Sequence, residues 1–329
     1  RPSATRSRSD RCNVELVEPS DNGPSRALHR AIGDTLAAGR AVGLLVPQRG
    51  YALSLWCRDC HRSVRCPRCE SGVTYERERL AARCPRCSFT ARAPDVCPSC
   101  GSAELVYLGA GSERMAEQLE RIFPRATVRR VDPNVLQGLS EAPEVGDADI
   151  YVTTWIGTKA ALRPDVSLVG VLDADQLIRR PDMRAAEVAY QALSELARWA
   201  GPASGGGRLV IQTREPGHHA IQSVVRGDPW YFIERELPIR KDLNYPPFSE
   251  LIKVRSRGDK AAAVLERVSR TAEAAGAVVL GPVDANVDGE DVVEMLLKCP
   301  DAHEVAVSLR VILPEVPRGM TLWFDVDPR

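Results

Sequence analysis

Eight of the ten cysteines occur in four C-x-x-C pairs within one short stretch of the chain. Outside an oxidising compartment, thiols at this spacing suit tetrahedral Zn²⁺, because one C-x-x-C turn presents two sulfurs and a second turn completes the shell. A disulfide cluster would need a secretory signal, and a redox C-x-x-C usually occurs once, on a βαβ unit. We therefore predict two zinc sites, with the ligands Cys57, Cys60, Cys66, Cys69, Cys84, Cys87, Cys97 and Cys100.

The spacing leaves two ways of assigning the pairs to the ions. In a nested arrangement, the loop of residues 70–83 closes over one ion, which is shared by the second and third pairs. The first and fourth pairs then share the other ion. In a sequential arrangement, neighbouring pairs along the chain share an ion. We favour the nested arrangement, with one zinc on Cys57, Cys60, Cys97 and Cys100 and the other on Cys66, Cys69, Cys84 and Cys87. His61 follows Cys60, and we expect a surface side chain there because both shells are already full.

Charge limits the partners of this cysteine module. Lys and Arg total 44 and so do Asp and Glu, so the whole chain has no net field that would attract nucleic acid or an anionic membrane. Residues 57–100 contain nine Arg and five acidic residues, but two all-thiolate zinc centres would cancel that surplus. Contact with a protein partner, or with a DNA strand junction through a few arginines, therefore fits the module better than a phosphate clamp does.

The chain shows no targeting or membrane segment. No apolar run approaches the ~20 residues that span a bilayer, and the first residues contain no apolar signal core. We expect a cytoplasmic protein with no membrane partner. The sequence does not begin with Met, and we expect it to be a piece of a longer chain. Residues 1–20 are expected to form a flexible segment, because Arg, Ser and Thr dominate their start.

The elements around the cysteines alternate between helix and strand. Helical spacing of Leu28, Ile32 and Leu36 precedes an apolar strand at 41–46. Such alternation predicts an α/β domain, with a parallel sheet and helices on both faces. We assign residues 21–56 and 101–215 to this domain and 57–100 to an inserted zinc-binding module. Further strands are expected at 105–108, 127–131, 149–153, 167–172 and 208–212, with helices near 115–122 and 184–200.

The last third of the chain has a different order. The pattern there is βαββαβ, which is typical of a ferredoxin-like α+β domain. We assign residues 216–329 to this carboxyl-terminal domain. Its strands are expected at 249–256, 277–280, 292–298 and 320–326, with helices at 260–275 and 302–313.

Two acidic residues follow the strand expected at 167–172. Asp173 and Asp175 lie at its carboxyl end, where open α/β sheets bind ligands. They could hold Mg²⁺ or a water, or they could simply cap the next helix. The sequence leaves both interpretations open.

Longer motifs resemble a known family. From about Arg26 onward, the chain is similar to the carboxyl-terminal half of bacterial primosomal replication restart proteins, the PriA or primosomal protein N-prime family. The four cysteine pairs carry the resemblance, together with "QRGYA", "PSCGSAELVYLGAGSERMAEQLERIFP", "RPDVSLVGVLDAD", "RRPDMRAAEVAYQAL", "YPPF" and "WFDVDP". The resemblance implies the nested zinc pairing, a RecA-like second helicase lobe that bears the zinc module, and a carboxyl-terminal domain. It also implies forked or single-stranded DNA, primosome proteins and replicative helicase-loading proteins as partners, with single-stranded DNA-binding protein as a further candidate.

The chain departs from this family in its helicase motifs. Active members read like G-T-Q-M-x-x-K-G where this chain has Trp155 for the Gln, Lys159 retained and Ala160 for the Gly. In the second motif, T-Q-V-A-G-R-A-G-R, Trp199 and Pro202 stand where the two arginines would stabilise the γ-phosphate of ATP. Arg198 is one residue away, which turns its side chain by about 100 degrees on a helix. Glu195 stands in the place of the motif's Gln.

We therefore predict a DNA-binding primosome assembly factor for replication restart that recognises forked DNA and helps reload the replicative helicase. It would have no catalytic residues, and ATP would serve at most as a bound ligand. The alternatives are an active ATP-dependent 3′-to-5′ helicase and a zinc-ribbon interaction module unrelated to replication. Aromatic residues that could stack on single strands, but fit a core or an interface better, are Trp155, Trp199, Trp230 and Tyr245.

Overall fold

The structure is a computed structural model that describes most of the chain. The described residues are 11–20, 23–46, 54–77, 79–84, 89–108, 111–131, 147–154, 164–180, 182–258, 260–287, 290–317 and 319–328. Contacts divide the chain into two compact units. The first holds the described residues of 1–64, 74–82 and 92–235, and the second holds those of 65–73, 83–91 and 236–329.

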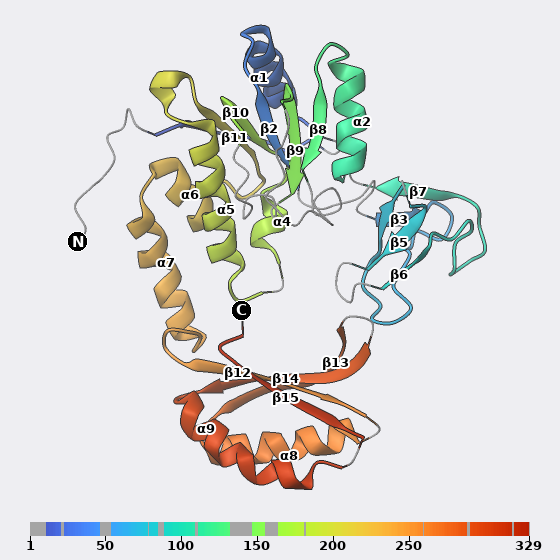
Figure 1. The fold of residues 1–329 in the computed structure, drawn as a ribbon, viewed down its shortest axis with the longest axis vertical. Coiled ribbons are helices and arrows are strands. Elements are labelled where there is room, and N and C mark those ends of the chain that lie inside the picture. The colour runs from blue at the N-terminus through green and yellow to red at the C-terminus, as the bar shows by residue number, and fades with distance from the viewer. Residues whose placement is uncertain are drawn as a thin grey trace. The chain divides into compact units, whose positions relative to one another are not determined.

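A six-stranded sheet forms the centre of the first unit (Figure 1). Its strand order is β1-β11-β10-β2-β9-β8, and all neighbouring strands run parallel. Continuous apolar runs such as VGLLV in β2 suit strands that are buried on both faces. The strands are β1 (Asn13–Val17), β2 (Val42–Val46), β8 (Val128–Val131), β9 (Ile150–Thr154), β10 (Leu168–Val171) and β11 (Arg208–Gln212).

Helices cover both faces of this sheet. On one face, Leu28 of α1 (Arg26–Ala37) and Met115 of α2 (Ser112–Ile122) share a buried cluster with Leu44. On the other face, α5 (Ala185–Ala200) and α6 (His219–Arg226) bury apolar side chains with Leu45. At Gly170, an added Cβ would lie 2.6 Å from Leu44 Cδ2 and 2.8 Å from Leu28 Cδ1. The close packing of α1 on β10 therefore depends on glycine at this position.

Shorter elements complete the first unit and the cysteine module. The helix α4 (Asp175–Ile178) follows β10, the short helix η3 (Ala203–Gly205) precedes β11, and α7 (Pro229–Asp242) follows α6. In the module, β3 (Ser54–Cys57) and β7 (Leu105–Leu108) form an antiparallel pair. A three-stranded sheet has the order β4-β5-β6, from β4 (Thr74–Glu76), β5 (Ala81–Arg83) and β6 (Thr90–Arg92).

The carboxyl-terminal part of the second unit has the element order βαββαβ. Its antiparallel sheet has the order β13-β14-β12-β15. Residues of α8 and α9, such as Leu265 and Val305, share one buried cluster with Ile252 and Leu297 of the sheet. The elements are β12 (Glu250–Arg257), α8 (Ala261–Ala274), β13 (Val278–Val287), β14 (Glu290–Cys299), α9 (Ala302–Leu309), η4 (Arg310–Glu315) and β15 (Thr321–Val326).

The structure differs from the sequence expectations in three places. Residues 13–17, expected to be flexible, form β1, because their backbone pairs with β11 at the edge of the sheet. Residues 105–108 pair with β3 instead of entering the parallel sheet. Residues 219–226, which we assigned to the carboxyl-terminal domain, form α6 and pack with α5 in the first unit, where Ile221 and Val224 are buried. Among the described residues, no helix combines the length and apolarity needed to cross a bilayer.

Candidate metal centres

The cysteine pairs gather into two clusters. The first cysteine cluster consists of Cys57, Cys60, Cys97 and Cys100, and the second contains Cys66, Cys69 and Cys84; in each, all sulfurs lie within 4.8 Å of one another. Cys87 lies outside the described residues. These groups are those of the nested arrangement, since the sequential one would combine the first pair with the second.

The sulfur spacing fits a tetrahedral thiolate shell. The Sγ–Sγ distances are 3.6 Å for Cys57–Cys100 and 3.7 Å for Cys60–Cys97. In the second cluster, Cys69 and Cys84 are 3.4 Å apart. A disulfide would need about 2.05 Å. Four sulfurs at ~2.3 Å from one Zn²⁺ would lie about 3.8 Å from each other, so the donors present match a metal centre.

The four C-x-x-C pairs share one type of backbone hydrogen bond. In each, the N–H of the first cysteine donates to the carbonyl oxygen five residues later. The residue after the second cysteine takes a left-handed conformation in three described turns, with φ of 56° at His61, 56° at Glu70 and 76° at Gly101. This conformation lets the chain reverse around the sulfurs. The four bonds are Cys57 to Arg62 at 2.9 Å, Cys66 to Ser71 at 2.8 Å, Cys84 to Phe89 at 2.8 Å and Cys97 to Ser102 at 2.7 Å.

The thiols of the first cluster differ in acidity. Desolvation opposes ionisation of Cys97, but backbone N–H groups of Ser99 and Cys100 and the neighbouring thiols lower its pKa to about 6. Desolvation, together with neighbouring thiols, raises the pKa of Cys60. Four adjacent thiols cannot all ionise without a cation to balance them. Cys12 and Cys299 lie outside both clusters, and desolvation raises the pKa of each to about 11.

A buried carboxylate joins the cysteine module to α2, and sequence reasoning missed it. Glu113, in the first turn of α2, is 4% exposed, and its Oε2 accepts the N–H of Arg77 at 2.9 Å. The Arg77 side chain also pairs with the exposed Glu117 at 3.0 Å. Tyr75 of β4 stacks on Tyr107 of β7 at 4.5 Å between ring centroids. The available signal was an acidic residue one position after the start of a helix, which is too common to single out Glu113.

The two aspartates after β10 have structural partners. Asp175 is buried, and its carboxylate accepts Thr213 Oγ1–H at 2.5 Å and Arg214 N–H at 3.0 Å. Asp173 accepts Gln176 Nε2–H at 2.8 Å. Neither aspartate belongs to a candidate metal cluster within the described ranges. Asp175 therefore holds the turn after β11, which favours the structural interpretation of this pair.

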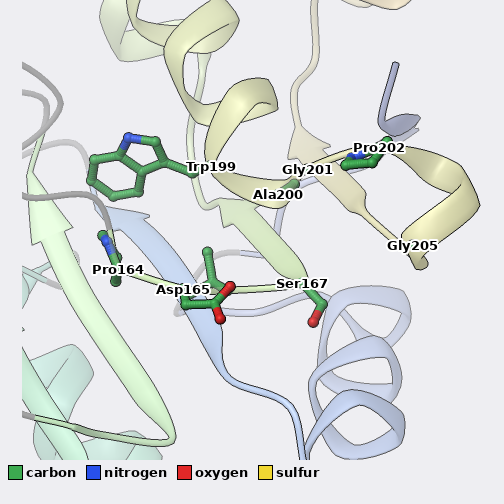
Figure 2. A pocket seen from close by; sticks show the side chains of 9 residues that line it. Pro164, Asp165, Ser167, Trp199, Ala200, Gly201, Pro202 and Gly205 are labelled. Atoms are coloured by element: carbon green, nitrogen blue, oxygen red, sulfur yellow. The ribbon is translucent and has the colours of Figure 1, made fainter. Parts of the chain in front are cut away.

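The positions that the resemblance aligns with helicase arginines line a cavity. Figure 2 shows Trp199 and Pro202, from the end of α5 and the loop after it, facing Asp165 and Ser167 of the segment before β10. The cavity holds about 420 Å³, and Asp165 is the one charged residue in its described lining. Trp199 Nε1–H donates to Glu195 Oε1 at 3.2 Å. Arg198 pairs with Glu195. Trp155, Lys159 and Ala160 lie outside the described residues.

Comparisons with known proteins find primosomal replication restart proteins both for the carboxyl-terminal domain and for most of the chain. Residues 241–329 match the family described as Primosomal protein N C-terminal domain. The chain is 31% identical to the Replication restart protein PriA of Synechocystis sp., covering 96% of this chain and 40% of the relative. The corresponding protein of Bacillus subtilis is 33% identical over 82% of this chain and 35% of its own length. The corresponding protein of Treponema pallidum is 32% identical over 96% of this chain and 51% of its own length. The chain thus spans about half or less of the length of these relatives.

Proposed function

Because the chain belongs to the PriA family of replication restart proteins, we propose that it is a DNA-binding factor for primosome assembly that acts without motor activity of its own. It recognises forked DNA and helps reload the replicative helicase in the bacterial cytoplasm. Its protein partners are primosome and helicase-loading proteins, with single-stranded DNA-binding protein as a further candidate. The names of the relatives, their 31–33% identity and the matched carboxyl-terminal domain support this assignment.

The architecture supports a degenerate helicase scaffold. We propose that the parallel sheet of the first unit is a RecA-like second helicase lobe, into which residues 57–100 are inserted. The βαββαβ order and the strand order β13-β14-β12-β15 support a ferredoxin-like carboxyl-terminal domain. In this scaffold, the lobe and the domain present surfaces to DNA and partners.

Each cysteine cluster binds one structural Zn²⁺ in this proposal. Cys57, Cys60, Cys97 and Cys100 supply four thiolates to one ion, and Cys87 joins Cys66, Cys69 and Cys84 at the other. A closed four-thiolate shell leaves no open position for water or substrate. The zinc would therefore hold the fold of the module, and its binding energy would be folding energy.

The observation that carries the loss of motor activity is the cavity lined by Trp199 and Pro202. The resemblance aligns both residues with arginines that would stabilise the transferred phosphoryl group, a contribution worth ~10³–10⁵ in rate in other nucleotide hydrolases. The described lining of the cavity contains no cationic side chain. Arg198, the nearest arginine in sequence, is committed to the ion pair with Glu195.

Fork recognition tests the proposed function. The purified protein should bind a labelled three-way fork more tightly than a blunt duplex of the same length and sequence, as measured by fluorescence anisotropy at one fixed salt concentration. Fixing the salt matters because phosphate contacts make all DNA affinities depend on it. Equal affinity for fork and duplex, or no binding to either, would overturn the assignment.

A further inference from the structure

Two arginines stack on Tyr231 where α6 meets α7, and a third arginine contacts the backbone of one of them. Arg226 ends α6, and its guanidinium carbon lies 4.4 Å from the centroid of the Tyr231 ring. Arg235 lies one turn after Tyr231 on α7, and its guanidinium carbon is 3.6 Å from the same centroid. Arg11 donates a hydrogen bond from Nη1 to the Arg226 carbonyl oxygen. We call Tyr231 and the three arginines Arg11, Arg226 and Arg235 the arginine cluster.

No ion pair joins the arginine cluster to an acid in the part of the chain that the structure describes. Within the described ranges, none of its three guanidiniums forms an ion pair, whereas arginines elsewhere do, as Arg208 does with Glu15. The Asp228 carboxylate, the nearest acid along the chain to Arg226, accepts the N–H of Trp230 at 2.9 Å at the start of α7. Like charges held this close repel one another, so binding an anion would stabilise the arrangement.

Stacking leaves the arginines able to bind an anion. A guanidinium that stacks on an aromatic face keeps its in-plane N–H donors free, and those donors match the oxygens of a phosphate. Tyr231 thus fixes the position of two donor sets without using their hydrogen-bonding edges. Arg226 and Arg235 are exposed, so an anion can reach them.

We infer that the arginine cluster binds the phosphate backbone of DNA. The inference rests on the proposed function, because DNA is the polyphosphate that such a protein would meet. Trp230 is the next residue to Tyr231 and is 47% exposed, which offers an indole on which an unpaired base can stack. This exposure favours a single strand over a duplex as the bound form. Contacts of this kind give affinity and salt dependence but little sequence preference.

A charge-matched pair of double variants tests the inference in the full chain. Arg226→Gln with Arg235→Gln removes two cluster charges, and Arg125→Gln with Arg129→Gln removes two charges elsewhere. Arg125 and Arg129 are exposed and have no ion pair among the described residues. Binding of labelled oligo(dT) and of a blunt duplex is measured by anisotropy over a salt series. Losing two phosphate contacts should weaken oligo(dT) binding about ten-fold and reduce the slope of log K against log salt by about 1.4.

The control variant should retain the wild-type slope. Tyr231→Phe should bind like the wild type because the ring remains, and Tyr231→Leu should weaken binding although every charge remains; thermal melts establish that each variant is folded. Unchanged affinity and slope in the cluster variant on both DNA forms, or an equal loss in the control, would overturn the inference. A loss on the duplex alone would overturn the preference for a single strand. Wild-type protein that binds no DNA would overturn the proposed function instead.

Discussion

A four-thiolate zinc centre depends on every one of its donors, because a missing sulfur leaves an open position and removes charge that the ion needs. The first cysteine cluster brings all four donors together, with Sγ–Sγ distances of 3.6 and 3.7 Å across it. Each donor is held by a turn in which a backbone N–H bonds five residues ahead. Substituting one cysteine should therefore remove the ion of its own cluster, while the other cluster keeps all of its cysteines.

The zinc content of the purified protein tests the assignment of the cysteine ligands. Elemental analysis of the purified protein should find two zinc ions per chain, and Cys60→Ser should reduce this to one, because three thiolates retain the ion poorly. Cys12→Ser is the matched control and should retain both ions, since Cys12 lies outside the clusters. Fewer than two zinc ions in the wild type, or an undiminished content in Cys60→Ser, would contradict the assignment.

Sequence reasoning identifies residues whose chemistry is local and misses contacts between residues that are distant in the sequence. The cysteine pairs were predictable as candidate ligands, because a C-x-x-C turn is local and its spacing alone brings two sulfurs together. Glu113 was not predictable, because its partner Arg77 lies 36 positions away in the sequence. The sequence left open whether Asp175 binds a ligand or has a structural role. Its contacts with Thr213 and Arg214, which only the fold brings together, favour the structural role.

At the level of elements, the seam between β4 and α2, formed by Arg77 and Glu113, connects the cysteine module to the parallel-sheet part of the first unit. Glu113 should stabilise this seam, because its buried carboxylate is the acceptor for the Arg77 N–H. Glu113→Ala should lower the free energy of opening the Arg77 amide by about 1–3 kcal/mol, since a buried donor loses its acceptor. Hydrogen exchange of a peptide covering residues 74–77 measures this change.

Glu117→Ala provides the matched control for that measurement. It removes the other carboxylate that contacts Arg77, but this ion pair is exposed, with 54% and 42% of the two side chains accessible. An exposed ion pair contributes about 0–1 kcal/mol, so exchange should change little. Equal effects of the two substitutions would show that the buried hydrogen bond does not hold the seam.

Periodicity predicted most elements of the sheet but not every strand pairing. The apolar runs of β2, β9, β10 and β11 identify buried strands wherever they pair. The strand β7 has a similar local pattern, yet it pairs with β3 across the cysteine module. The strand β1 was missed because it follows a polar, arginine-rich segment and is defined by its pairing with β11. Pairing between distant segments is a property of the fold that no local pattern encodes.

Across the whole chain, a helix-covered parallel sheet, two cysteine clusters and a carboxyl-terminal domain that matches the family are present. Trp199 and Pro202 stand at the positions that the resemblance aligns with arginines. Both residues fit their places: Trp199 is 5% exposed and hydrogen-bonded to Glu195, and Pro202 borders the cavity before β11. The boundary between units was less predictable than the elements, since it falls within α7 rather than at residue 216. A continuous helix carries no break in composition that would mark such a boundary.

The rate of ATP hydrolysis by the purified protein with saturating forked DNA tests the proposed loss of motor activity most directly. We expect the protein to bind the fork with no hydrolysis above the rate measured without protein, because Trp199 and Pro202 stand where the resemblance places the arginines that would stabilise the transferred phosphoryl group. Fork-stimulated turnover of about one per second or faster, within the usual range for enzymes that transfer phosphoryl groups, would contradict it.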